Sequence, residues 1–134
     1  MTFSEYFAEA WSQPTPEQLV ALLHEHVVLM QPHRPPIHGK TAALREFTRL
    51  LHWLPGLHGA VDRFVENDST AFIEWRLQVP LKSGVAVIPA VDRFLLRDGL
   101  GIERCVYFDQ MLMNRMVATN PELWSGALRY RLGK

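Results

Sequence analysis

The second half of the chain alternates apolar and polar residues in four successive stretches, and this alternation limits the possible folds more than any other feature. In the clearest stretch, residues 70–79, the apolar members occupy every second position: Ala71, Ile73, Trp75, Leu77 and Val79. Because alternate side chains of a strand lie on opposite faces, the pattern predicts a strand with one buried face and with Trp75 in the interior. Similar stretches, separated by short turns, predict strands over residues 59–66, 84–96 and 102–113. Four consecutive strands indicate an antiparallel meander.

The first third of the chain has the spacing of helices instead. Apolar residues at helical intervals predict a first helix over residues 3–11. Thr15 as an N-cap, with Pro16 at the first helical position, predicts a second helix that ends near residues 24–26. Leucines and Phe at helical intervals predict the longest helix over residues 44–54.

Two shorter segments complete the expected order. The apolar run at residues 27–30 predicts an isolated strand, followed by a proline-rich loop. Asn120 as an N-cap and Pro121 predict a last helix, within a C-terminal extension of residues 114–134. Helices followed by strands predict an α+β fold, a single domain over residues 1–134, with the helices packed on one face of a curved sheet.

Charge and cysteine content limit the expected partners. Lys and Arg number 14 and Asp and Glu number 14, without a basic run, so we expect no nucleic-acid partner. The apolar runs stay well short of about 18 residues and the N-terminus opens with acidic residues, so we expect no membrane span and no export signal. Cys105 is the single cysteine, which excludes an internal disulfide and fits a cytoplasmic location.

Asp92 is the one polar side chain in its row of the strand over residues 84–96, where the other members are Ala86, Ile88, Ala90, Phe94 and Leu96. The opposite row is also mostly apolar and would suit contact with a partner subunit. In the last strand, Cys105 and Tyr107 share one row and Arg104 belongs to the other. The alternation alone leaves open which row of each strand faces inward.

The two-helix start, the segment IHGKTAALREF at residues 37–47 and the segment VDRFLLRDGLGIERCVYFD at residues 91–109 together resemble the NTF2-like superfamily, in particular its SnoaL-like and ketosteroid-isomerase-like members. The resemblance covers residues 3–113. It implies a cystatin-like cone, in which a strongly bent sheet wraps around helices, with a pocket inside and a homodimer formed through the outer face of the sheet. The superfamily includes isomerases, epoxide hydrolases, polyketide cyclases, dehydratases and non-catalytic modules, so the fold alone does not specify a reaction.

The ketosteroid-isomerase pattern implies roles for individual positions. Asp92 matches an aspartic acid that stays protonated and donates a hydrogen bond to an oxyanion, which places its row inside the cone. The general-base position of that pattern falls on Gln31, which cannot take a proton from carbon. The oxyanion-hole tyrosine falls on Phe7, or on Tyr6 if the helix registers differ by one.

The limonene-epoxide-hydrolase pattern is matched at one of its three positions. Asp109 matches the last aspartate of that pattern, whereas Trp75 and Leu77 occupy the places of its arginine and its other aspartate. The resemblance therefore supplies neither complete set of catalytic residues.

Three residues are candidate catalytic groups. Asp92 and Asp109 could act as acid and base if both point into an apolar cone, because burial and mutual repulsion would raise a carboxyl pKa. The alternative is that Asp92 accepts from Tyr107 or a backbone amide and that Asp109 pairs with Arg104 or a loop amide. His33, in the loop near the expected pocket mouth, is a candidate general base, and the alternative is a solvated loop histidine.

Eight further residues are candidates to line the pocket: Gln31, Trp53, Trp75, Phe94, Cys105, Tyr107, Tyr6 and Phe7. An aromatic wall suits a flat apolar ligand, although the same aromatic side chains suit a core equally well. The histidines of His24-Glu25-His26 are too close in sequence for the helical zinc motif, so we expect no metal and no cofactor.

The sequence thus favours a cytoplasmic homodimer that binds a small apolar organic molecule in an internal pocket. Any chemistry would be cofactor-free acid–base catalysis of the isomerase, cyclase or hydrolase type. The alternative is a non-catalytic ligand-binding or dimerisation module with a degenerate active site, which the glutamine at position 31 favours.

Overall fold

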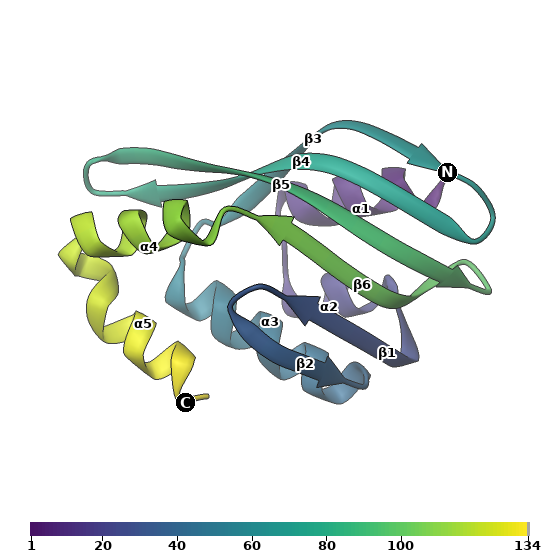
Figure 1. Cartoon of the computed structure of the whole chain (residues 1–134), viewed down its shortest axis with the longest axis horizontal. Helices are drawn as coiled ribbons and strands as arrows, with labels where there is room; N and C mark the ends of the chain where they lie inside the picture. The colour runs from purple at the N-terminus through teal and green to yellow at the C-terminus, as the bar shows by residue number, and fades with distance from the viewer. Residues whose placement is uncertain (134) are drawn as a thin grey trace.

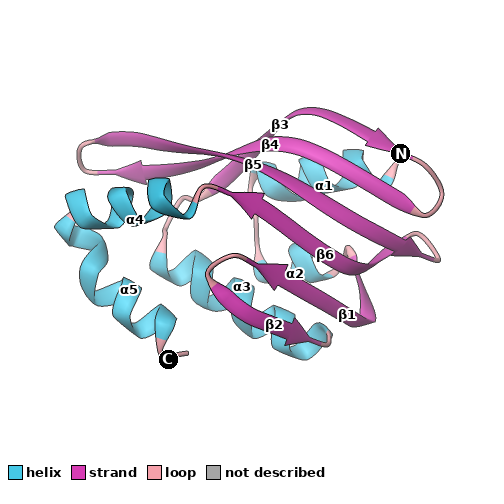
Figure 2. Ribbon diagram, viewed as in Figure 1, coloured by secondary structure: helices cyan, strands magenta, loops and turns pink. Residues whose placement is uncertain are grey.

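The computed structural model describes residues 1–133 and contains one six-stranded sheet with helices against one face and at one end (Figure 1, Figure 2). The helices are α1 (Phe3–Ser12), α2 (Pro16–Val20), α3 (Lys40–Trp53), α4 (Gln110–Thr119), the short 3-10 helix η1 (Pro121–Leu123) and α5 (Trp124–Arg131). The strands are β1 (Leu23–Gln31), β2 (Arg34–His38), β3 (His58–Glu66), β4 (Thr70–Leu81), β5 (Gly84–Arg97) and β6 (Leu100–Phe108). Within residues 1–133, every helix is too short or too polar to cross a membrane.

The sheet has the strand order β2-β1-β6-β5-β4-β3. Neighbouring strands are antiparallel except β1 and β6, which run parallel. Strands β3 to β6 form the predicted meander, and β4 and β5 keep one register from Thr70 opposite Leu95 to Leu81 opposite Gly84. The expected α+β class, with N-terminal helices and a mainly antiparallel sheet, is confirmed.

The segment after α2 differs from the expectation. α2 ends at Val20 rather than near residues 24–26, and β1 begins at Leu23. β1 is not isolated, because it pairs with β2 on one side and with β6 on the other. β2 occupies the expected loop, and its Pro35 and Pro36 are tolerated because an edge strand need not donate every N–H to a ladder. The apolar spacing near the end of α2 favours a longer helix, but the pairing of β1 with the distant β6 makes these residues a strand instead.

The end of the meander also differs from the expectation. β6 stops at Phe108 rather than Met113, because Asp109 begins α4 as its N-cap. The Asp109 carboxylate accepts from the backbone N–H groups of Met111 (2.9 Å) and Leu112 (3.3 Å), which a helix start leaves without partners. α4, η1 and α5 then fold back at the end of the sheet, toward α3 (Figure 1).

The core lies between the sheet and the N-terminal helices. Phe7 and Trp11 of α1 pack on Trp75 of β4, with ring centroids 4.9 and 4.8 Å apart. Trp75 is 1% exposed, so its predicted interior position is confirmed. Gly59 of β3 makes room for this ring, because a Cβ at that position would lie 2.5 Å from a Trp75 ring carbon.

Candidate functional site

A cavity of about 50 Å³ lies inside the cone, between α1, α3 and the inner face of the sheet. We call it the cone cavity. Its walls are apolar over most of their area, and they include Leu50, Leu77, Val79, Ile88, Phe108 and Met113. Three polar side chains also reach it, those of Gln31, His33 and Arg104. Polar groups placed in an otherwise apolar cavity are the arrangement that orients a small ligand.

Asp92 is fully buried, and both of its carboxylate oxygens accept a hydrogen bond. The Trp75 indole N–H donates to Oδ1 at 2.8 Å, and the Arg104 Nε–H donates to Oδ2 at 2.5 Å. Burial raises the pKa of the Asp92 carboxyl, while the Arg104 charge and the two hydrogen bonds oppose that rise. Because both carboxyl oxygens accept from these donors, Asp92 is an acceptor in this structure rather than the donor that the resemblance implied.

Arg104 is the cation at the inner end of the cone cavity. Its side chain is 6% exposed, and its charge lies 5.9–6.0 Å from the ring centroids of Trp11, Phe47 and Phe94. Within residues 1–133, its hydrogen bonding is limited to the Nε contact with Asp92, so the two terminal NH₂ groups keep their donors. The Asp92 contact therefore holds the guanidinium in place and leaves its outer edge available to the cavity.

His33 is held in one tautomer by a chain of hydrogen bonds. Its Nε2 lies 2.9 Å from the Tyr130 hydroxyl, which donates to Glu46 Oε2 at 3.2 Å. Because a tyrosine has one hydroxyl hydrogen, His33 Nε2 must carry the proton and donate to Tyr130. Nδ1 is then an unprotonated acceptor, and it is buried without a partner among residues 1–133.

The charge state of this chain follows from its surroundings. Burial, together with the charges of Arg34, Arg131 and Arg104, lowers the pKa of His33 to about 4, so the imidazole is neutral at pH 7. Burial and the Glu46 carboxylate raise the pKa of Tyr130, which therefore stays protonated.

Tyr130 also attaches α5 to the mouth of the cone cavity. The Arg34 Nη1 donates to the Tyr130 carbonyl at 2.9 Å and lies 3.3 Å from the buried carboxylate of Glu46. The Tyr130 ring stacks on Trp53 with centroids 5.0 Å apart. A residue near the end of the chain thus joins β2, α3 and the loop that carries His33.

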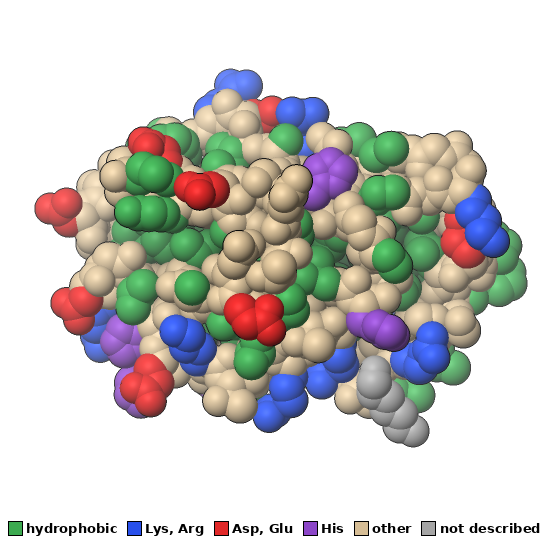
Figure 3. Space-filling view, turned by 180° about the vertical axis from the view of Figure 1, so that it is seen from behind, with side chains coloured by type: hydrophobic (Ala, Val, Ile, Leu, Met, Phe, Trp, Pro, Cys, Tyr) green, Lys and Arg blue, Asp and Glu red, His purple; other side chains and the backbone are tan. Residues whose placement is uncertain are grey.

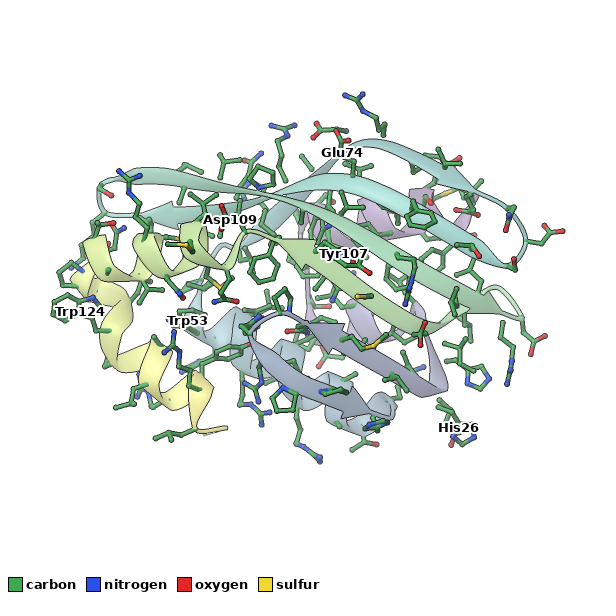
Figure 4. All side chains as sticks on the ribbon, viewed as in Figure 1. His26, Trp53, Glu74, Tyr107, Asp109 and Trp124 are labelled. Atoms are coloured by element: carbon green, nitrogen blue, oxygen red, sulfur yellow. The ribbon has the colours of Figure 1, made fainter. Side chains whose placement is uncertain are left out.

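Four of the predicted site residues lie away from the cone cavity. Asp109 is exposed and caps α4, so the expected Asp92–Asp109 pair inside the cone is wrong. Tyr107 is 54% exposed, and it projects from the outer side of β6 with Cys105 two residues before it in the same row (Figure 4). Tyr6 is 50% exposed on α1. The inward row of β6 is the row of Arg104, the choice that the alternation left open.

The other predicted residues fall into three groups. Gln31, His33 and Trp75 line the cone cavity. Phe7 and Phe94 belong to the packed core instead, where their ring centroids lie 5.8 Å apart. Trp53 lies between α3 and α5 and donates its indole N–H to the Leu123 carbonyl at 3.2 Å, so it is a helix-packing residue (Figure 4).

Three important residues were missed by sequence reasoning as members of the site: Arg104, Glu46 and Tyr130. Arg104 shares its row of β6 with Val106 and Phe108, and these apolar neighbours were the available signal that Arg104 faces inward. Glu46 is the one acidic residue of α3, and it is 0% exposed. Tyr130 lies 97 residues from His33, and local spacing carries no signal for such a contact.

Solved structures with the same fold include ligand complexes. A protein with a ketosteroid isomerase-like fold from Catenulispora acidiphila, in complex with trimethylamine, is 14% identical, with a TM-score of 0.73 over 82% of this chain and 88% of that one. An NTF2-like protein from Burkholderia pseudomallei is 18% identical, with a TM-score of 0.74 over 86% and 94%. TerC co-crystallised with polyporic acid is 18% identical, with a TM-score of 0.72 over 86% and 93%. At these identities the likeness establishes the fold.

The family follows from the sequence match. A comparison with curated proteins finds no match to the chain. The sequence model of the SnoaL-like domain family matches residues 3–104, which is most of the chain. The chain therefore belongs to the SnoaL-like family and has the NTF2-like, ketosteroid isomerase-like fold.

Proposed function

We propose that the protein binds a small, largely apolar organic molecule in the cone cavity and holds its carbonyl oxygen with Arg104. The observation that carries this proposal is the buried guanidinium, whose terminal NH₂ groups have no hydrogen-bond partner among residues 1–133 and whose side chain lines an apolar cavity. A ligand oxygen that accepts from these cationic donors forms charge-assisted hydrogen bonds, which are stronger than hydrogen bonds between neutral groups.

The charge of the pair selects a neutral acceptor. Asp92 already neutralises Arg104, so an anionic ligand would place a second negative charge beside a buried carboxylate. A ketone, ester or lactone accepts two hydrogen bonds without that penalty. The same donors would stabilise the negative charge that develops on a carbonyl oxygen during enolisation.

The size of the cavity favours a compact ligand. Its volume of about 50 Å³ is far below the roughly 300–1,000 Å³ of pockets for drug-sized molecules. A five-membered ring ketone is therefore a better first probe than a polycyclic compound, which would need α5 to move.

The test is a titration with cyclopentanone, followed by the ¹³C methyl resonances of Ile88 and Met113, which line the cavity. We expect saturable shifts at both methyl groups and weaker binding of cyclopentane, which lacks the carbonyl. The variant Leu50→Phe fills the cavity and should abolish the shifts. The matched variant Leu51→Phe, one position along α3, should keep them. Equal binding by both variants would remove the cone cavity as the site.

A second candidate function is cofactor-free proton transfer, and it is favoured by the Nδ1 atom of His33, which has no hydrogen-bond partner in the described part of the chain. His33 lines the cavity together with Arg104, and a small rotation of its neutral imidazole would bring the Nδ1 lone pair to the carbon next to a bound carbonyl, where it could take a proton. The low pKa of about 4 makes it a weak base that is available throughout the neutral range.

Exchange of the α-hydrogens of cyclopentanone in D₂O tests this second candidate. We expect the protein to accelerate the exchange, with a rate that is flat above about pH 5 and is lost as the pH falls through the His33 pKa of about 4. The variant His33→Gln should remove the acceleration while leaving cyclopentanone binding in place. If cyclopentanone binds but its hydrogen exchange is not accelerated, the protein is a ligand-binding module without this catalytic activity.

We also propose that two copies of the chain pair through the outer face of the sheet, in the cytoplasm. This face exposes a set of large apolar side chains: Phe72, Val85, Val87, Val91, Leu95 and Tyr107. Monomers rarely expose contiguous apolar patches of this kind. The variant Val91→Lys should halve the mass measured by sedimentation equilibrium, whereas Leu128→Lys, on exposed α5, should not.

A further inference from the structure

A second hollow lies on the outside of the cone, between α3 and α5. We call it the α3–α5 groove, and its volume is about 380 Å³. α3 contributes Arg49, His52 and Trp53, and α5 contributes Ser125 and Arg129. Seen from behind, several Lys and Arg side chains lie along the lower edge of the molecule (Figure 3). None of these groove residues belongs to the cone cavity.

The floor of the groove is aromatic because α5 lies very close to Trp53. A Cβ on Gly126 would lie 2.6 Å from Trp53 Cδ1, so glycine at this position lets the helix approach the indole. The Trp53 indole N–H donates to the Leu123 carbonyl, and the Trp53 ring stacks on Tyr130. These contacts fix a flat apolar surface beneath the polar rim.

The rim carries positive charge without a matching carboxylate. Among residues 1–133, neither Arg49 nor Arg129 lies within 4 Å of an acidic group. Within the described residues the buried Arg49 Nε has no hydrogen-bond partner, and the Arg49 Nη1 makes one long contact of 3.5 Å with the Gly133 carbonyl. Glu122, the one acidic residue of the groove, accepts from the backbone N–H of Lys82 at 3.0 Å.

We propose that the α3–α5 groove binds a small aromatic carboxylate, with the carboxylate on Arg49 and Arg129 and the ring against Trp53. Guanidinium groups match the planar geometry of a carboxylate and form strong charge-assisted hydrogen bonds with it. A carboxylate in the groove would accept from the terminal NH₂ groups of the two arginines, which lie near no acidic group within residues 1–133. This ligand differs in charge from the neutral carbonyl compound of the cone cavity, and the groove lies outside that cavity, so the inference stands independently of the proposed function.

A titration with benzoate tests the inference, with the indole ¹H–¹⁵N resonance of Trp53 as the reporter and Trp53→Phe to assign it. We expect a saturable shift of this resonance and binding at least about tenfold weaker in Arg49→Met and in Arg129→Met, because each variant removes a charge-assisted contact. Arg129 is exposed, so its variant should fold normally even if Arg49→Met does not. The matched variant Arg97→Met removes an exposed arginine elsewhere and should leave the affinity unchanged.

Two comparison ligands make the test decisive. Benzyl alcohol, which keeps the ring but has no charge, should bind at least about tenfold more weakly than benzoate. Inorganic phosphate, which has charge but no ring, should also bind more weakly. The inference is overturned if benzyl alcohol matches benzoate, if phosphate matches benzoate, or if Arg97→Met weakens binding as much as Arg129→Met does. Failure of cyclopentanone to bind in the cone cavity would leave these outcomes unaffected.

Discussion

The two buried ion pairs of the cone are held in different ways. Asp92 and Arg104 lie on adjacent strands, β5 and β6, whose register sets them near each other. Arg34 and Glu46 lie on β2 and α3, and Tyr130 of α5 completes their contacts. The first pair therefore depends on the register of one sheet, whereas the second depends on the docking of the C-terminal helix.

The two pairs also differ in access to water. The side chains of Arg104 and Asp92 are 6% and 0% exposed, whereas that of Arg34 is 16% exposed beside a fully buried Glu46. If one partner of the inner pair is removed, the remaining charge is poorly reached by water. If one partner of the outer pair is removed, water can reach the remaining charge more easily, because Arg34 is partly exposed. The inner pair therefore places Arg104 in the lining of the cone cavity, whereas the outer pair lies outside that lining and connects β2, α3 and α5.

The largest expected effect comes from Arg104→Met, which leaves the Asp92 carboxylate buried without its cation. We expect a loss of roughly 3–5 kcal/mol in the free energy of unfolding, measured by urea denaturation. The double variant Arg104→Met with Asp92→Leu should recover most of that loss, because neither charge remains. A loss no larger than that of Arg97→Met, at an exposed position, would contradict the inner pair as described.

Tyr130→Phe tests the outer pair and should have a smaller effect. The variant keeps the ring that stacks on Trp53 but removes the hydroxyl that contacts His33 and Glu46. We expect a loss of about 1–3 kcal/mol in the free energy of unfolding. Hydrogen exchange should also become faster in α5 while the exchange of β5 and β6 stays unchanged. Equal acceleration in all three elements would contradict the separate roles of the two ion pairs.

The third expected effect is a pH dependence of stability that His33 contributes. Its pKa is lowered from 6.5 to about 4 in the folded protein, so between these values the unfolded chain binds more protons. Stability from this group is therefore complete above about pH 6.5 and is lost as the pH falls toward 4. His33→Gln should flatten the dependence of the urea midpoint over that window, whereas His26→Gln, at an exposed position, should not. Identical slopes in the two variants would place the titration elsewhere.

Much of the fold could be predicted because it rests on local pattern. The alternation in residues 70–79 predicted β4 and the burial of Trp75, and Thr15 with Pro16 predicted the start of α2. β1 and β2 were misjudged because their pairing depends on β6, far along the chain. α4 was missed although Asp109 followed by apolar residues at helical spacing is a helix-start signal.

The site was less accessible to sequence reasoning than the fold. The resemblance placed Asp92 in the interior, which the structure bears out, but its charge state depends on Arg104 and Trp75 as hydrogen-bond donors. The alternation in β6 left two rows open, and the choice between them decided whether Arg104 or Tyr107 faces the cavity. The contacts of Tyr130 with His33 and Glu46 come from tertiary packing alone, so no local sequence motif could predict them.

The most direct test of the central claim is a crystal structure of the protein in complex with cyclopentanone. The proposed role of Arg104 predicts the ketone inside the cone, with its oxygen within hydrogen-bond distance of a terminal nitrogen of Arg104 and with Asp92 still hydrogen-bonded to Nε. A ketone bound elsewhere, or one seated in the cavity with its oxygen turned away from Arg104, would contradict it.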